Sequence, residues 1–366
     1  MDYLYLASAK NDPGVINVYR VDAQTGALLQ IPNSPFPAGR NPVGLVTSPN
    51  GKTLYVINHD DNTIIVYGIG TDAKLYAQST YNTPGSEPVA LAINAAGTLL
   101  FVVDFYAPLF TDLNPGPGAL IVYSIDPATG NLGQTGPVTQ TLPSAQSASY
   151  YPLNAAPTAV NVLANGSTLY VTDQAAGCAK APATLGGAVE ALSIGSTGVV
   201  TPVAGSPLCA GVTPSAVASH PSSSYVYVTD SAQSQLLGFS VGVGGALSPV
   251  GSVGTGEAPS SVVVDSNGRF MFVTNRGSSN LTGYSIAAGT GIPSLTGSYG
   301  TGAFPQCVIV EPHLKRFVYT ADFQGLGITG YELDPSTGVL SGTENSPYGG
   351  TGLSTCLTAT THGSQR

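Results

Sequence analysis

Tyr227-Val228-Thr229-Asp230 is one copy of a short motif that recurs along this chain. Each copy joins an aromatic residue to mostly β-branched residues and ends in Asn or Asp, which is typical of a buried strand that stops at a polar corner. The other copies are Tyr55-Val56-Ile57-Asn58, Phe101-Val102-Val103-Asp104, Tyr170-Val171-Thr172-Asp173, Phe272-Val273-Thr274-Asn275 and the looser Tyr319-Thr320-Ala321-Asp322. A proline precedes them by about 13 residues, at Pro42, Pro88, Pro157, Pro214, Pro259 and Pro305. The sequence therefore holds an internal repeat of about 45 residues, which two insertions lengthen.

Each repeat predicts four short antiparallel strands. A strand follows the proline, the Tyr-Val strand comes second, and a third strand ends in an aromatic residue such as Tyr67 or Tyr284. A tight turn such as Asp126-Pro127-Ala128-Thr129-Gly130 leads to the fourth strand. Four strands per repeat indicate an all-β, seven-bladed β-propeller that spans residues 1–366 as a single domain.

The two chain ends complete the seventh blade. The N-terminus begins at a second strand, Leu4 to Ala7, so the first strand of its blade is missing. Residues 354–360 occupy the place where another repeat would begin. We expect this C-terminal strand to pair with the N-terminal one, because closure of the ring removes exposed sheet edges.

Composition excludes several classes of partner. The 366 residues include 11 Lys and Arg against 20 Asp and Glu, a net charge of −9. A chain with so few cations offers no electrostatic footprint for nucleic acid, and no apolar run approaches the length of a membrane span. The low charge and the many small residues suit an exported, extracytoplasmic protein whose leader is not part of this sequence. We expect a monomer.

The Tyr-Val-Thr-Asp/Asn units and the Asp-x-x-Thr-Gly-x-Leu turns resemble the bacterial lactonase-type seven-bladed propellers. That family includes 6-phosphogluconolactonase-like and muconate-cyclising enzymes and the YVTN-repeat surface proteins. The resemblance covers essentially the whole chain and implies a lactonase-like fold. The Arg-His pair and the Glu that the resemblance implies for catalysis are replaced here: Val43-Gly44 follows Pro42, for example, and His59 follows Asn58.

The loop-rich rim of the propeller holds the candidate site. One blade after another presents an Asn or Asp there, and two interpretations remain open. These side chains cap backbone amides at the strand ends, or some of them form an acidic ring that binds a polyol or a Ca²⁺ or Mg²⁺ ion in the central funnel. The candidate ligand-binding residues are Asn58, Asp61, Glu87, Tyr106, Asp173, Asp230, Arg276 and Asp322.

His59, Asp104 and Arg40 are the candidate catalytic residues. His59 is the one histidine expected on the loop-rich rim, and its carboxylate neighbours would support a general base. A solvated loop histidine is the alternative. Three insertions on the same rim, residues 105–118, 133–156 and 174–187, carry aromatic residues that would form a ligand clamp, a neutral decoration or an interface.

Four cysteines bear on the compartment. Cys178 and Cys209 are expected on the loop-rich rim, where a bridge between them would staple an inserted loop and fit an oxidising compartment. Cys307 and Cys356 occupy matching positions on the first strands of neighbouring blades, as a second bridge or as two packed thiols.

Two functions follow from these features. The first is a binding propeller that holds a polar small molecule, a glycan or a protein on its loop-rich rim. The second is a divergent hydrolase of the lactonase or esterase type that acts in the central funnel, with a metal ion as an aid if one binds there.

Overall fold

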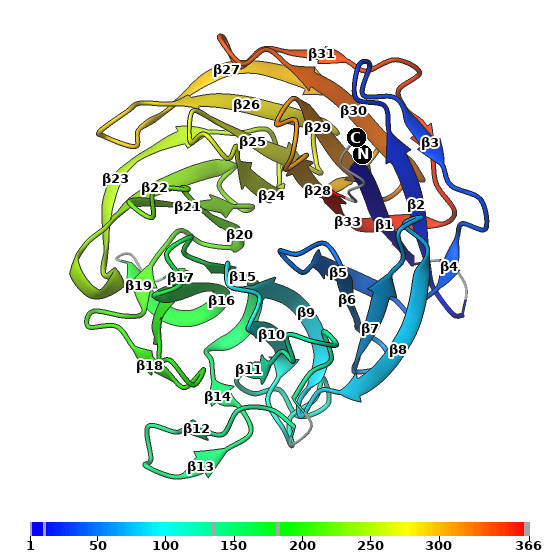
Figure 1. The fold of residues 1–366 in the computed structure, drawn as a ribbon. Coiled ribbons are helices and arrows are strands. Elements are labelled where there is room, and N and C mark those ends of the chain that lie inside the picture. Colours follow the sequence, from blue (N-terminus) through cyan, green and yellow to red (C-terminus); the bar gives the residue numbers. More distant parts are fainter. Residues whose placement is uncertain (1, 10–11, 134–135, 181–183, 362–366) are drawn as a thin grey trace.

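The computed structural model describes residues 2–9, 12–133, 136–180 and 184–361. Seven antiparallel sheets stand around a central axis (Figure 1). Their innermost strands contact one another in a closed cycle, which confirms the predicted seven-bladed propeller.

Blades 1 to 7 follow the chain, and each runs from the axis outward. Blade 1 holds β33 (Leu353–Thr361), β1 (Asp2–Ala9), β2 (Val15–Val21) and β3 (Leu28–Gln30); blade 2 holds β5 (Pro42–Thr47), β6 (Thr53–Asn58), β7 (Thr63–Ile69) and β8 (Leu75–Asn82). Blade 3 holds β9 (Ser86–Ile93), β10 (Leu99–Tyr106), β11 (Ala119–Ser124) and β14 (Tyr151–Pro152); blade 4 holds β15 (Ala155–Val162), β16 (Thr168–Lys180), β17 (Thr184–Ile194) and β18 (Val200–Pro202). Blade 5 holds β20 (Pro214–Ser219), β21 (Tyr225–Asp230), β22 (Gln235–Val241) and β23 (Leu247–Gly254); blade 6 holds β24 (Pro259–Val264), β25 (Phe270–Asn275), β26 (Asn280–Ile286) and β27 (Pro293–Gly300); blade 7 holds β28 (Pro305–Val310), β29 (Phe317–Asp322), β30 (Gly327–Leu333) and β31 (Leu340–Gly342).

Short elements extend this frame. The two-residue strands β4 (Phe36–Pro37), β19 (Leu208–Cys209) and β32 (Tyr348–Gly349) pair with the third strands of blades 1, 4 and 7. β12 (Gln140–Thr141) and β13 (Ser147–Ala148) form a separate hairpin in the insertion of blade 3. A 3₁₀ turn, η1 (Val243–Gly245), joins β22 to β23.

Blade 1 is built from both ends of the chain, as predicted. β33 runs antiparallel to β1, with Leu4 opposite Ala359 and Leu6 opposite Leu357 (Figure 1). No peptide connection crosses this seam, because one strand ends the described chain and the other begins it. Closure therefore depends on the pairing of β33 with β1 and on what holds β33 in place.

The tyrosines of the repeated motif join neighbouring blades. The second-strand hydroxyl of Tyr55, Tyr170, Tyr227 or Tyr319 donates to a glycine carbonyl in the outer turn of the next blade, at Gly130, Gly245, Gly291 or Gly26, over 2.7–2.8 Å. Third-strand tyrosines such as Tyr67 and Tyr284 donate back to the preceding blade, at Pro37 and Gly254. A buried phenol needs a partner for its O–H. The same side chain thus fills the core between two blades and ties them together.

A β-bulge interrupts the first strand of every blade. The residue after the first-strand proline, or after Ser354 in blade 1, has no partner on the second strand. The seven bulge residues are Val43, Val89, Thr158, Ser215, Ser260, Gln306 and Thr355. A bulge re-aims the side chain that it carries, and these seven side chains line the central cavity.

Candidate functional site

A cavity of about 530 Å³ lies inside the ring of first strands. The bulge residue of every blade lines it, together with His59, Gln174, Ser231 and Arg276, which follow the second strands of blades 2, 4, 5 and 6. The cavity is large enough for a small molecule. Through these four residues the cavity reaches the rim where the second strands end, which is the rim that the sequence selected.

Hydroxyls in the cavity wall are already bonded to protein. Thr158, Ser215, Ser260 and Thr355 each donate to the carbonyl of the first-strand proline in the next blade, at Pro214, Pro259, Pro305 and Pro42. We call these four contacts the hydroxyl staples. Each staple links two first strands directly, so these hydroxyls hold the ring together and keep no free proton for a ligand.

Unpaired polar groups of the cavity lie elsewhere. The exposed guanidinium of Arg276 forms no hydrogen bond or ion pair within the part of the chain that the structure describes, and the same holds for the amide of Gln306. In contrast, Gln174 donates to Pro214 O and Ser231 to Thr213 O. The bulge residues of blades 2 and 3, Val43 and Val89, offer only hydrocarbon. The cavity therefore combines one free cation with an apolar section of wall.

His59 is the titratable group of the cavity with acid–base geometry. Its Nδ1 lies 2.7 Å from Asp60 Oδ1, and its Nε2 lies 3.9 Å from Glu87 Oε2. Partial burial raises the pKa of Asp60, but hydrogen bonds from Asn41 and His59 outweigh it, so the pKa of this carboxyl is lowered. An ionised carboxylate only accepts, so Nδ1 carries the proton and Nε2 is left as the acceptor. Asp60 thus orients a base that lines the cavity, and the Glu87 carboxylate favours the imidazolium that forms once Nε2 takes up a proton.

The predicted acidic ring does not line this cavity. Asp230 is fully buried and accepts bonds from four backbone amides, those of Val212, Thr213, Ala232 and Gln233, over 2.8–3.3 Å. Asn58 accepts from the Gly39 amide and donates to Thr63. These residues have the capping geometry that the sequence left open as the first interpretation.

Two more members of that ring are equally enclosed. Asp104 Oδ2 accepts from the Gly85 amide at 2.9 Å, Oδ1 is buried without a partner, and burial raises the pKa of this carboxyl well above its usual range. Asp322 accepts from Thr320 and Thr329, and burial raises its pKa against the effect of those bonds. Asp104 is therefore placed inside blade 3 and not beside His59 in the cavity.

Asp173 belongs to a buried carboxyl pair that the sequence did not reveal. Asn154 bridges it to Glu190 of β17, with its side-chain amide 3.3 Å from Asp173 and its backbone N–H 2.5 Å from Glu190. Burial raises the pKa of Asp173 to about 7 and that of Glu190 to about 7. Glu190 stands within an apolar strand, Gly187-Ala188-Val189-Glu190-Ala191-Leu192, and this isolated carboxylate was the available sequence signal.

Arg40 and Asp61 pair with each other at the edge of the rim. Arg40 Nε lies 2.6 Å from Asp61 Oδ1, and its backbone N–H also donates to Asp61. Neither lines the cavity. The aromatic residues of the insertions are packed inward: Tyr106 and Tyr151 are 9% and 5% exposed, and Phe110 and Tyr150 contact the core between blades 2 and 3. These four side chains support the rim, and none of them is exposed as an aromatic clamp.

The cysteines are oxidised wherever the structure describes their side chains. Cys307 of β28 and Cys356 of β33 form a disulfide with their Cα atoms 5.0 Å apart, which resolves the alternative that the sequence left open. Cys209 is also disulfide-bonded. The side chain of Cys178, its predicted partner, lies outside the described residues, so that pairing stays a prediction.

No group of three or more His, Cys, Asp and Glu side chains is arranged to hold a metal ion in the described ranges. The expected Ca²⁺ or Mg²⁺ site therefore stays a prediction. Across the same ranges, no helix has the length and apolar character needed to cross a membrane.

Comparison with known families matches this geometry. The profile of the family described as "Lactonase, 7-bladed beta-propeller" matches residues 31–137, 200–310 and 255–357. The chain belongs to this lactonase family. No curated protein matches its sequence. The family assignment agrees with the resemblance found in the repeats, and it fixes the fold and the lineage rather than a substrate.

Solved structures extend over nearly the whole chain at low identity. The periplasmic gluconolactonase of Pseudomonas aeruginosa aligns with a TM-score of 0.79 at 17% identity, covering 99% of this chain and 100% of that one. A Bacteroides fragilis protein described as a candidate 6-phosphogluconolactonase aligns with a TM-score of 0.76 at 16% identity, covering 98% of each chain. Hydrazine synthase of Kuenenia stuttgartiensis aligns with a TM-score of 0.61 at 15% identity, over 90% and 94% of the two chains. Such likeness shows the fold alone.

Proposed function

We propose that this lactonase-family propeller hydrolyses a small anionic lactone or ester in its central cavity. The observation that supports the proposal is the oriented base His59, which lines the same cavity as the unpaired cation Arg276. A base supplies the chemistry of hydrolysis, and a free guanidinium supplies a site for a carboxylate or phosphate of the substrate.

The proposed reaction adds water to the lactone carbonyl. His59 Nε2 removes a proton from water, and the resulting hydroxide forms the new C–O bond. Asp60 stabilises the imidazolium through Nδ1–H, and Glu87 adds a second negative charge near Nε2. When the ring C–O bond breaks, the imidazolium returns the proton to the leaving alkoxide. The product is a hydroxy acid, and the protein is regenerated.

Arg276 and the valines of the wall would select the substrate. Arg276 binds the anionic group, and Val43 and Val89 contact a hydrocarbon face. The hydroxyls of the staples already donate to proline carbonyls, so the wall has few donors left for a substrate that needs many hydrogen bonds. The proposed substrate is therefore a compact lactone acid with an apolar face.

Two features support a place outside the cytoplasm as part of the proposal. The Cys307–Cys356 disulfide suits an oxidising compartment, and one similar structure is a periplasmic protein. We also propose that the chain acts as a monomer, which light scattering on the purified protein tests directly.

The second candidate function is binding of a polar small molecule, a glycan or a protein on the loop-rich rim without turnover. The replacement of the catalytic residues that the family resemblance implies favours it. Calorimetric titration with lactones that carry or lack an acid group separates the two functions, because a binding propeller gives saturable heat of binding with no acid release.

The test is acid release in a pH-stat with lactones that carry or lack an acid group. We expect turnover of acidic lactones that falls at least 100-fold in His59→Gln and about 10-fold in Asp60→Asn. Arg276→Gln should raise KM for acidic lactones and leave neutral lactones unchanged. His313→Gln and Arg20→Gln, which remove the same side chains away from the cavity, are the matched controls. Addition of a chelator tests the predicted metal ion. Turnover that is unchanged in His59→Gln would refute the proposal.

A further inference from the structure

The seven junctions between first strands are not held in the same way. Hydroxyl staples cross the junctions of blades 4–5, 5–6, 6–7 and 1–2. Val43 and Val89 occupy the staple position at the junctions of blades 2–3 and 3–4, where a hydrocarbon side chain has nothing to donate. At the junction of blades 7 and 1 the position holds Gln306, which makes no such contact among the described residues.

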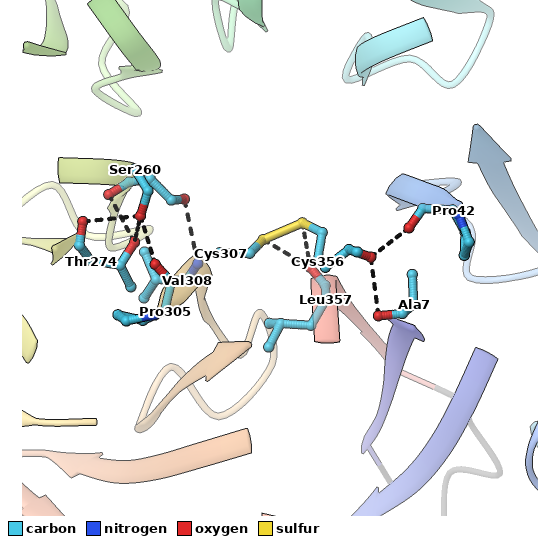
Figure 2. Close-up of a disulfide and its surroundings, with 11 residues drawn as sticks. Ala7, Pro42, Ser260, Thr274, Pro305, Cys307, Val308, Cys356 and Leu357 are labelled. Carbon is cyan, nitrogen blue, oxygen red and sulfur yellow. Dashed lines mark hydrogen bonds between the residues drawn. A yellow bond between two sulfur atoms is a disulfide. The ribbon is translucent and has the colours of Figure 1, made fainter. Parts of the chain in front are cut away.

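A disulfide stands at that last junction instead. Cys307 directly follows the bulge residue Gln306, and Cys356 directly follows the bulge residue Thr355. Figure 2 shows the bridge between Ser260 and Pro305 on one side and Pro42 on the other. The staples from Ser260 to Pro305 and from Thr355 to Pro42 therefore flank it. The S–S bond therefore continues the line of contacts around the cavity.

This junction borders the one seam that the peptide chain does not cross. β33 is held by backbone pairing with β1 within blade 1, and by its contacts with the first strands of the two neighbouring blades, β28 and β5. If β33 separated from β1, the propeller would open at blade 1. A covalent bond from β33 to β28 keeps the terminal strand in position for β1, because it limits how far the strand can move away.

We propose that the Cys307–Cys356 disulfide is the clamp that closes the ring, and that its reduction makes closure reversible. The inference is independent of the proposed hydrolysis. Both cysteines line the central cavity, so a small thiol can reach the bond from there. In thiol–disulfide exchange a dithiol reductant transfers two electrons and two protons to the two sulfurs and is itself oxidised to its disulfide. β33 is then held only by hydrogen bonds and packing.

The Cys307→Ala/Cys356→Ala variant tests the clamp. Blades 3, 4 and 5 carry alanine at the matching positions Ala90, Ala159 and Ala216, so this change fits the local packing of the ring. Loss of a bridge across 49 residues should lower Tm by about 5 °C. Hydrogen exchange of residues 353–361 should become at least 10-fold faster, and exchange of β20 and β24 should not change. Ser260→Ala, which removes one hydroxyl staple, is the matched control and should lower Tm by about 1 °C.

Adding Gln306→Ser to the double variant distinguishes a disulfide that holds this junction closed from one that only stabilises the protein in general. It recreates the Pro-Ser pair of Pro214-Ser215 and Pro259-Ser260 at the open junction. We expect it to recover about 1 °C and to slow exchange of β33, whereas the same change in the wild-type protein should have no effect on exchange.

Reduction of the wild-type protein gives a second measurement if the double variant does not fold. Cys209 is also disulfide-bonded, so peptide mapping must show that Cys307 and Cys356 are reduced. Exchange of β33 that stays as slow as in the oxidised protein would overturn the proposal. So would faster exchange spread evenly over all blades, because that result means general destabilisation and no local opening.

Discussion

Asp230 offers a direct test of whether the polar corners cap strands or bind a ligand. Its side chain is fully buried, and its two oxygens accept four backbone amides. Asp230→Ala removes the acceptor of all four amides. The amides of Val212 and Thr213 are partly buried, and an unsatisfied buried donor costs about 1–3 kcal/mol. Ala232 and Gln233 are exposed, so water can replace their lost bonds at a smaller cost.

The expected loss in the free energy of unfolding is about 3–5 kcal/mol for Asp230→Ala. With an entropy of unfolding of about 2.1 cal/mol/K per residue over 366 residues, Tm should fall by about 4–6 °C. Asp230→Asn keeps the oxygen that accepts three of the amides and should lower Tm by about 2 °C. Calorimetric melting of the two variants and of the wild type measures both shifts.

Turnover completes the experiment. As a cap, Asp230 lies outside the cavity, and the folded Asp230→Asn protein should keep the wild-type kcat and KM for any lactone that the wild type hydrolyses. Reduced turnover or weaker binding in Asp230→Asn, with an unchanged Tm, would refute the capping assignment and return Asp230 to the site.

Three further results are expected. Thermal stability should decline between pH 5 and pH 8, because the folded-state pKa values of Asp173 and Glu190 are raised to about 7. In this range the folded protein binds more protons than the unfolded chain. The stability that protonation of the two carboxyls adds is therefore complete below about pH 4 and is lost as pH rises through 7. Asp173→Asn should flatten that decline, to which each carboxyl contributes about 3–4 kcal/mol, and a melting series in matched buffers checks it. Tyr227→Phe keeps the ring and removes the bond to Gly291; it should destabilise the protein by about 1 kcal/mol in denaturant unfolding, whereas Tyr76→Phe, on an exposed ring, should have no effect. Arg40→Gln should break the ion pair with Asp61 at the exposed rim, with no measurable change in Tm and no change in lactone turnover.

The fold could be predicted because the repeat carries its own packing rules. The aromatic of the Tyr-Val strand, the glycine of the outer turn and the first-strand proline recur together, and the structure joins the first two through the tyrosine-to-glycine bonds. Blade closure followed from the same pattern, since an N-terminal second strand and a C-terminal first strand complete one repeat.

The candidate site could be predicted only in part. His59 and Arg276 come from the position after the second strand, where the sequence directed attention, and both line the cavity. The acids one residue earlier differ because strand alternation turns adjacent side chains to opposite sides, and the inward side is filled by loop amides. The bonds of Ser215 and Ser260 depend on a bulge and on the neighbouring blade. Sequence spacing within one repeat carries no information about the bulge or about the contact with the neighbouring blade.

The hydroxyl staples limit how this cavity can evolve. A wall residue that bonds to the next blade cannot be exchanged for a ligand contact without loosening the ring, so recognition and cohesion compete for the same four positions. Val43, Val89 and Gln306 carry no such duty, and new specificities should arise there first. The propeller is thus symmetric in its architecture and uneven in its freedom to change.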